Sequence, residues 1–125
     1  METEQKIEKK SGQYGEIAVV NLDDNHITSA AEGMDFLISL SYNSGCNRVV
    51  FNKEGFSEDF FVLSTKILGE LLQKCVNYNL KLAIYGDYSV YTSKPLKDFI
   101  YESNNGKDFF FVNSKEEAVE RLSKV

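Results

Sequence analysis

The sequence predicts an α/β fold, with a mostly parallel sheet and helices packed on it. Apolar runs typical of strands alternate along the chain with segments of helical periodicity. The strand-like runs are almost continuously apolar, as is expected of strands that are covered on both faces. At 125 residues the chain is expected to form one domain of four strand–helix pairs, with one extra antiparallel strand in front.

The N-terminal region predicts a hairpin. Residues 1–12 form an N-terminal segment or an edge strand, the strand itself being expected at residues 6–10. The turn signal Gly12-Gln13-Tyr14-Gly15 follows, and residues 16–22 read EIAVVNL, a pattern typical of a strand. The α/β domain proper is therefore expected to span residues 13–125.

Helix-start signals mark three of the predicted helices. Ser29 and Ser114 are each followed three residues later by a glutamate, Glu32 and Glu117, in the capping-box pattern. Ser93 offers an N-cap for another helix. Short apolar runs at residues 48–52 and 109–112 supply two buried strands.

The centre of the chain predicts a long helix followed by a strand. Ser57 offers an N-cap, and two acidic residues follow it at the positive end of the helix dipole. Apolar residues then recur at helical spacing, so the helix is expected to run over residues 58–77. Asn77 and Asn79 end it, and residues 80–85 read LKLAIY, a strand.

Composition excludes several classes of function. A net charge of −5 argues against nucleic-acid binding, which needs clustered Lys and Arg. No apolar run approaches the ~20 residues that span a membrane, and no signal peptide precedes the chain, so a cytoplasmic location is expected. Cys46 and Cys75 are the only cysteines, and they are expected to be reduced and buried.

Polar residues follow the predicted strands, at the edge of the sheet where ligands bind in open α/β folds. A ligand site there would use side chains from three strand ends: Asn52, Lys53, Glu54, Asp87, Ser89, Tyr91 and Asn113. Gly86, beside Asp87, lets another group approach the backbone closely. The alternative is that these residues only cap helices and bind loop backbone.

The polar face of the long helix is a second candidate surface, for a partner protein. It carries Lys66, Gly69, Glu70, Gln73 and Lys74. The alternative is a solvated face with weak ion pairs along the helix. Gly69 is unusual there, since glycine inside a helix costs about 1 kcal/mol relative to alanine. A close crossing by another helix or by a second copy of the chain would explain it.

Motifs for catalysis, metals and cofactors are lacking. His26 is the only histidine and is expected in an exposed loop beside acidic residues. One histidine and two distant cysteines do not suit a zinc site, and no Walker or GxGxxG pattern is present. Catalytic residues therefore stay unassigned, and no metal or cofactor is expected.

Residues 58–106, followed by FFFV and EEAVERL, resemble a bacterial family catalogued as a domain of unknown function. The resemblance covers residues 15–123, and its most specific parts include Thr65-Lys66, Gly69-Glu70 and Gly86-Asp87. The element order is also similar to that of the STAS domain, the fold of anti-sigma-factor antagonists. The chain departs from those regulators at residues 58–61, where they carry a phosphorylated serine.

Two functional hypotheses follow. The first is a cytosolic STAS-like regulatory or protein-interaction module without catalysis, whose partner is another protein or a second copy of the chain. The second is a small enzyme or ligand-binding protein that uses the polar crevice at the strand ends, with Glu54 and Asp87 as its acids. Fold analogy alone does not decide between them.

Overall fold

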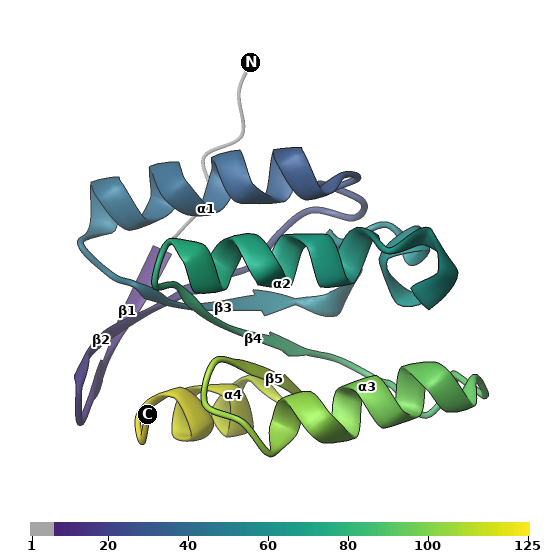
Figure 1. The fold of residues 1–125 in the computed structure, drawn as a ribbon. Coiled ribbons are helices and arrows are strands. Elements are labelled where there is room, and N and C mark those ends of the chain that lie inside the picture. Colours follow the sequence, from purple (N-terminus) through teal and green to yellow (C-terminus); the bar gives the residue numbers. More distant parts are fainter. Residues whose placement is uncertain (1–6) are drawn as a thin grey trace.

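Five strands form one sheet in the computed structural model, which describes residues 7–125 (Figure 1). The strands lie in the order of the chain. β1 pairs antiparallel with β2, and every later pair is parallel. The bounds are β1 (Ile7–Gly12), β2 (Gly15–Val20), β3 (Arg48–Asn52), β4 (Lys81–Tyr85) and β5 (Phe109–Val112). The predicted fold class is thus confirmed, including the antiparallel N-terminal strand. Lys6, the first residue expected in that strand, lies outside the described residues.

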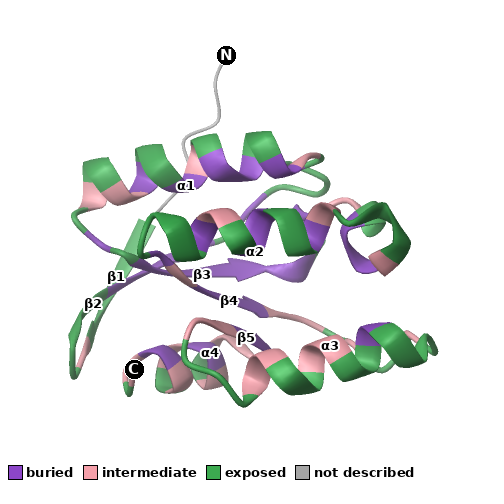
Figure 2. Ribbon diagram, viewed as in Figure 1, coloured by how far each residue is buried: buried purple, intermediate pink, exposed green. Residues whose placement is uncertain are grey.

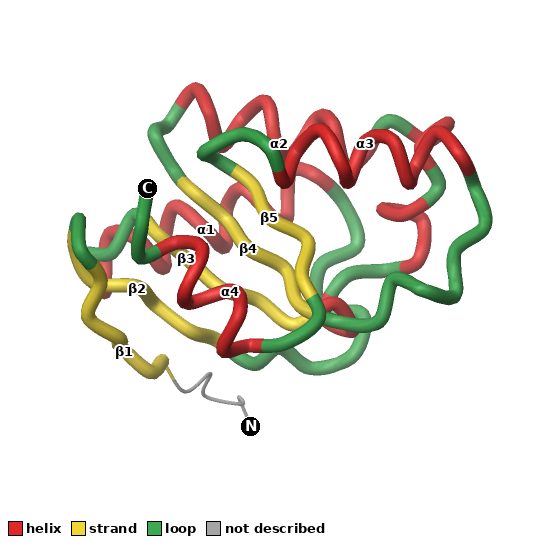
Figure 3. Tube along the Cα trace, turned by 90° about the horizontal axis from the view of Figure 1, so that it is seen from below, coloured by secondary structure: helices red, strands yellow, loops and turns green. Residues whose placement is uncertain are grey.

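Four helices cover the sheet unequally. α1 (Ala30–Ser44), α2 (Ile67–Asn77) and α3 (Lys94–Asn104) share one apolar core with the sheet. α4 (Lys115–Leu122) packs on the opposite face, where it crosses in front of the strands in Figure 3. Alternate residues of β2 to β5 enter the two cores, as the two-residue period of a strand requires, whereas β1 is largely exposed. On β3, for example, Val49 and Phe51 face the three helices and Val50 faces α4.

The central strands are the most buried part of the molecule (Figure 2). All five residues of β3 are buried, as are the three central residues of β4. The helices are exposed on their outer faces. Within residues 7–125, no helix combines the length and the apolar character needed to cross a bilayer.

The predicted helix caps of α1, α3 and α4 are confirmed. The hydroxyls of Ser29, Ser93 and Ser114 each accept a hydrogen bond from a backbone N–H of the first turn. Just after the C-terminal end of α2, Asn79 has a φ of 58°, the left-handed conformation that asparagine tolerates. Local signals therefore set most helix boundaries.

The long helix predicted over residues 58–77 is wrong in its first half. Two 3₁₀ turns, Glu58–Phe61 and Leu63–Thr65, precede Lys66, and α2 begins only at Ile67. Ser57 does not cap it: its hydroxyl is buried and has no hydrogen-bond partner. The reason is tertiary: Phe60 packs against Phe56, while Phe61 packs against Tyr88 and Tyr91 of the loop before α3. The 3₁₀ turn brings both rings into the aromatic core.

Asn104 protects the outer edge of β5. Its side-chain Oδ1 accepts from the backbone N–H of Phe111 at 2.8 Å, and its Nδ2 donates to the Phe111 carbonyl at 3.1 Å. One amide thus replaces the neighbouring strand that β5 lacks, which removes a site for edge-to-edge pairing.

Replacing Asn104 by alanine should lower the free energy of unfolding by about 1–3 kcal/mol, because it leaves two buried backbone groups unpaired. Urea denaturation measures the change. Asn105→Ala, at the exposed next residue, is the control and should change stability by no more than about 0.5 kcal/mol. Equal losses in the two variants would contradict the role of the side-chain amide.

Candidate functional site

The strand ends collect the predicted polar residues, but most of these already bind other groups of the chain. Asn52 is 6% exposed and turns inward. Its Oδ1 accepts from the backbone N–H of Leu22 at 2.6 Å, and its Nδ2 donates to the Leu22 carbonyl at 3.0 Å. Asn52 therefore fastens the chain that leaves β2 to the end of β3, and it is not available to a ligand.

Lys53 is enclosed by aromatic rings and an acid. The residue is 9% exposed, and its Nζ lies 3.3 Å from a Glu58 carboxylate oxygen. The same Nζ lies 4.9 Å from the ring centre of Tyr91 and 5.1 Å from that of Phe61. These four residues, Lys53, Glu58, Phe61 and Tyr91, are called the Lys53 cluster below. A Cβ at Gly86 would lie 2.5 Å from Lys53 Cβ, so this position needs glycine.

The electrostatics of the cluster keep Lys53 charged. Burial acts to lower the pKa of Lys53, but Tyr91 and Glu58 outweigh it, so the pKa lies above its ordinary value. Tyr91 donates its hydroxyl proton to Glu58 at 2.9 Å. Burial and this acceptor raise the pKa of Tyr91 despite the opposing effect of Lys53. A charged ammonium and a neutral phenol are suited to joining two segments of chain, and neither is a base at neutral pH.

Asp87 and Ser89 form a local turn. Asp87 Oδ1 accepts from the Ser89 hydroxyl at 2.6 Å and from its backbone N–H at 2.9 Å. These two bonds hold the pKa of the Asp87 carboxyl below its usual value. The pairing is an ordinary loop-stabilising pattern.

A small crevice remains at the ends of the parallel strands. It has a volume of about 470 Å³ and is lined by Glu54, Tyr85, Gly86, Asp87 and Asn113. Of the residues predicted for a ligand site, the structure brings Glu54, Asp87 and Asn113 to one hollow and places Lys53 and Tyr91 in the Lys53 cluster. Sequence reasoning missed Glu58 and Phe61 there, because it assigned both to a regular helix.

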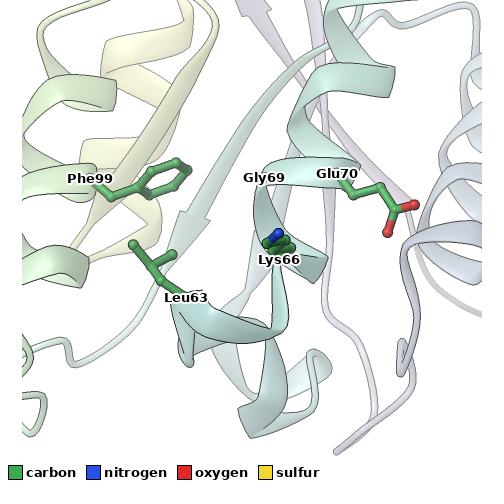
Figure 4. A pocket seen from close by; sticks show the side chains of 5 residues that line it. All are labelled: Leu63, Lys66, Gly69, Glu70 and Phe99. Atoms are coloured by element: carbon green, nitrogen blue, oxygen red, sulfur yellow. The ribbon is translucent and has the colours of Figure 1, made fainter.

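A larger hollow lies elsewhere, between α2 and α3 (Figure 4). Its volume is about 640 Å³, and its lining residues are Leu63, Lys66, Gly69, Glu70 and Phe99. Leu63 and Phe99 point toward one another across it, while the Glu70 carboxylate points away. We call this hollow the α2–α3 groove. It contains three residues of the predicted partner surface; the other two, Gln73 and Lys74, are not among its lining residues.

Gly69 lies open to solvent in the groove. A Cβ built at Gly69 would meet no atom of the described chain within 4 Å, so a close crossing by another of its four helices is wrong as an explanation. Leu63 and Phe99 were missed as groove residues. The periodicity of the third predicted helix indicated Phe99 only as a core residue, and no local signal singled out Leu63.

The remaining candidates lie apart from both hollows. His26 is exposed, as predicted, and its ring packs edge-on against Phe36 at 5.2 Å. Cys46 and Cys75 are free and buried, and burial raises the pKa of the Cys75 thiol to about 12. Among residues 7–125, no three His, Cys, Asp or Glu side chains gather as a metal site would require.

Comparison with known proteins gives one family. Residues 13–122 match the family model described as a domain of unknown function (DUF4180). No curated protein and no solved structure matches the chain.

Lys53→Met tests the Lys53 cluster, since methionine keeps the length of the stem and removes the ammonium. We expect the free energy of unfolding at pH 7 to fall by about 1 kcal/mol, the size of a shielded cation–π contact. The pKa of Lys53 is raised in the folded protein. The stability that the ammonium contributes should therefore be complete at pH values below 10.5, the ordinary pKa of lysine, and should disappear as the pH rises through the pKa in the folded protein. Urea unfolding from pH 7 to pH 12 measures it.

Lys97→Met is the matched control, because Lys97 is an exposed lysine on α3. It should leave stability within about 0.5 kcal/mol of the wild type. A Lys53→Met defect that persists unchanged at high pH would show that packing, and not the ammonium, carries the effect.

Proposed function

Since the chain belongs to a family described as a domain of unknown function (DUF4180), we propose from its own geometry that it is a cytosolic STAS-like regulatory or protein-interaction module without catalysis. The order of strands and helices motivates the comparison with STAS. The α2–α3 groove is the single observation that carries the proposal.

The groove has the character of a surface that another protein covers. Leu63 and Phe99 give it an apolar centre, while Lys66 and Glu70 lie exposed at its rim. Protein interfaces commonly combine an apolar centre with a polar rim. Val62, 50% exposed, lies next to Leu63 in a neighbouring hollow, so apolar surface continues beyond the groove.

Gly69 adds to this argument. Glycine inside a helix costs about 1 kcal/mol relative to alanine, and no contact with residues 7–125 requires it at this position. A partner that lies directly on the α2 backbone would require it. The polar side chains at the strand ends, in contrast, are largely engaged with other groups of the chain, which favours binding over chemistry as the role of the domain.

Capture of partners from a lysate of the source organism tests the proposal. Tagged wild type and Gly69→Arg are compared, because an arginine at residue 69 would occupy the groove while gaining helix propensity. We expect a protein that binds the wild type near stoichiometrically and is recovered at least about ten-fold less with Gly69→Arg, a loss of about 1.4 kcal/mol.

Asn77→Arg is the matched control, since it adds the same charge to an exposed position of α2 outside the groove. Capture should be unchanged in this variant. If the captured protein is the chain itself, the partner is a second copy, and sedimentation of the purified protein must show the dimer. Binding that both variants lose equally, or that neither loses, would rule out the groove as the contact surface.

The crevice at the strand ends supports a second candidate function, the binding of a small polar ligand or an enzyme acting on one. Glu54, Asp87 and Asn113 line it and offer carboxylate oxygens and an amide. A thermal-shift screen with small polar metabolites should then find a compound that raises the Tm of the wild type and not that of Glu54→Gln. A screen without any such compound would remove this candidate.

A further inference from the structure

Lys66 has a backbone conformation that its sequence does not explain. Its φ of 66° and ψ of 4° are left-handed, although it is neither glycine nor asparagine. For a residue with a Cβ, this conformation is disfavoured by about five- to thirty-fold relative to the right-handed one. Strained residues of this kind cluster at active sites, ligand clamps and switch regions.

The segment on the N-terminal side of Lys66 divides into a fixed half and a loosely held half. Phe60 and Phe61 are buried, and Glu58 is bound to the Lys53 cluster. Residues 62–66 are not buried at any position. Three turn hydrogen bonds, donated by the backbone N–H groups of Val62, Thr65 and Lys66, hold this second half. The Thr65 hydroxyl adds to them: it lies 2.8 Å from both the Asp59 and Val62 carbonyls and accepts from the backbone N–H of Ile67 at 3.4 Å.

The sequence just before α2 also fits a longer helix. In the observed structure Lys66 is the N-cap and gives no side-chain hydrogen bond to the first turn. Ser64, two residues earlier, is exposed and is a preferred N-cap residue. With Ser64 as the cap, Leu63 and Leu68 would occupy the two positions of a hydrophobic staple, the residue before the cap and the fourth of the helix.

We propose that Lys66 is the hinge of a two-state switch that reshapes the α2–α3 groove. In the observed state, Lys66 is left-handed and Leu63 faces Phe99 in the groove. In the second state, Lys66 turns to the right-handed conformation, α2 begins at Thr65, and Leu63 leaves Phe99 to pack against Leu68. The switch regulates recognition insofar as the proposed function of the groove is correct.

Two substitutions at the hinge should move the equilibrium in opposite directions. Lys66→Gly removes the cost of the left-handed state, so it should favour the observed state by about five-fold or more. Lys66→Ile should favour the helical state, because a β-branched residue is an outlier at positive φ. Thr65→Val should act in the same direction as Lys66→Ile, since it removes the hydroxyl that holds the 3₁₀ turn.

NMR of the labelled full chain, without any partner, measures the switch. In Lys66→Ile and Thr65→Val we expect helical Cα shifts at residues 64–66 and weaker nuclear Overhauser effects between the Leu63 methyl groups and the Phe99 ring than in the wild type. Lys66→Gly should show the opposite changes. The shifts of residues 58–61 should stay constant in all three variants, as the control for a local transition.

Unchanged shifts at residues 63–66 in both Lys66→Ile and Thr65→Val would overturn the switch. So would loss of the folded spectrum in Lys66→Ile, because an exposed residue with an accessible second state tolerates that change. Since the experiment contains no partner, its result is independent of the capture experiment, and the switch and the proposed function can fail separately.

Discussion

The burial of β3 is the constraint on which the rest of the structure depends. A central strand covered on both faces must bind every polar group that it carries, since an unpaired buried group costs about 1–3 kcal/mol. β3 has a polar residue at each end. Arg48 binds the carbonyl of Val125 at 3.0 Å and so holds the end of the chain, while Asn52 holds the exit of β2. Lys53, the next residue, joins the 3₁₀ turn to the loop before α3 through its cluster.

Geometry explains why a groove opens beside α2. Neighbouring strands lie about 4.8 Å apart, whereas packed helices need about 8–10 Å, so three helices on one face cannot each lie above the strands that they connect. The structure resolves this by close packing of α1 with α2 and by placing α3 at the β5 edge. Two helical glycines show that α1 packs closely on α2 and that α3 does not. A Cβ on Gly33 of α1 would lie 3.1 Å from Leu71 of α2, whereas a Cβ on Gly69 of α2 would have no described atom within 4 Å.

Much of the fold could be predicted from the sequence because its local and global signals agree. For the strand at residues 109–112 and the N-cap Ser114, for example, the local residue pattern predicts the same element that the α/β fold requires at that place. Less of the candidate site could be predicted from the sequence. The rule that strand ends meet at one edge placed Asp87 and Asn113 correctly at a crevice. The enclosure of Lys53 by Phe61 and Tyr91 could not be predicted, because it depends on contacts between segments that no local pattern encodes. The position of Leu63 opposite Phe99 was unpredictable for the same reason, because it depends on where α3 packs.

The longest stretch in which local signals and structure disagree, residues 57–66, ends in the groove, where Leu63 and Lys66 line it. Residues 57–66 carry the cap, charge and periodicity of a helix, but a 3₁₀ turn instead buries Phe60 and Phe61 against aromatic rings of other segments. A conflict resolved wholly by that burial would end at Phe61, yet the irregular backbone continues for five residues to a left-handed Lys66, one turn from an unexplained Gly69. Departures from local consistency are expected where a protein functions. Two such departures in the same groove, one of backbone and one of side chain, support our proposal that the functional surface of this domain lies between α2 and α3.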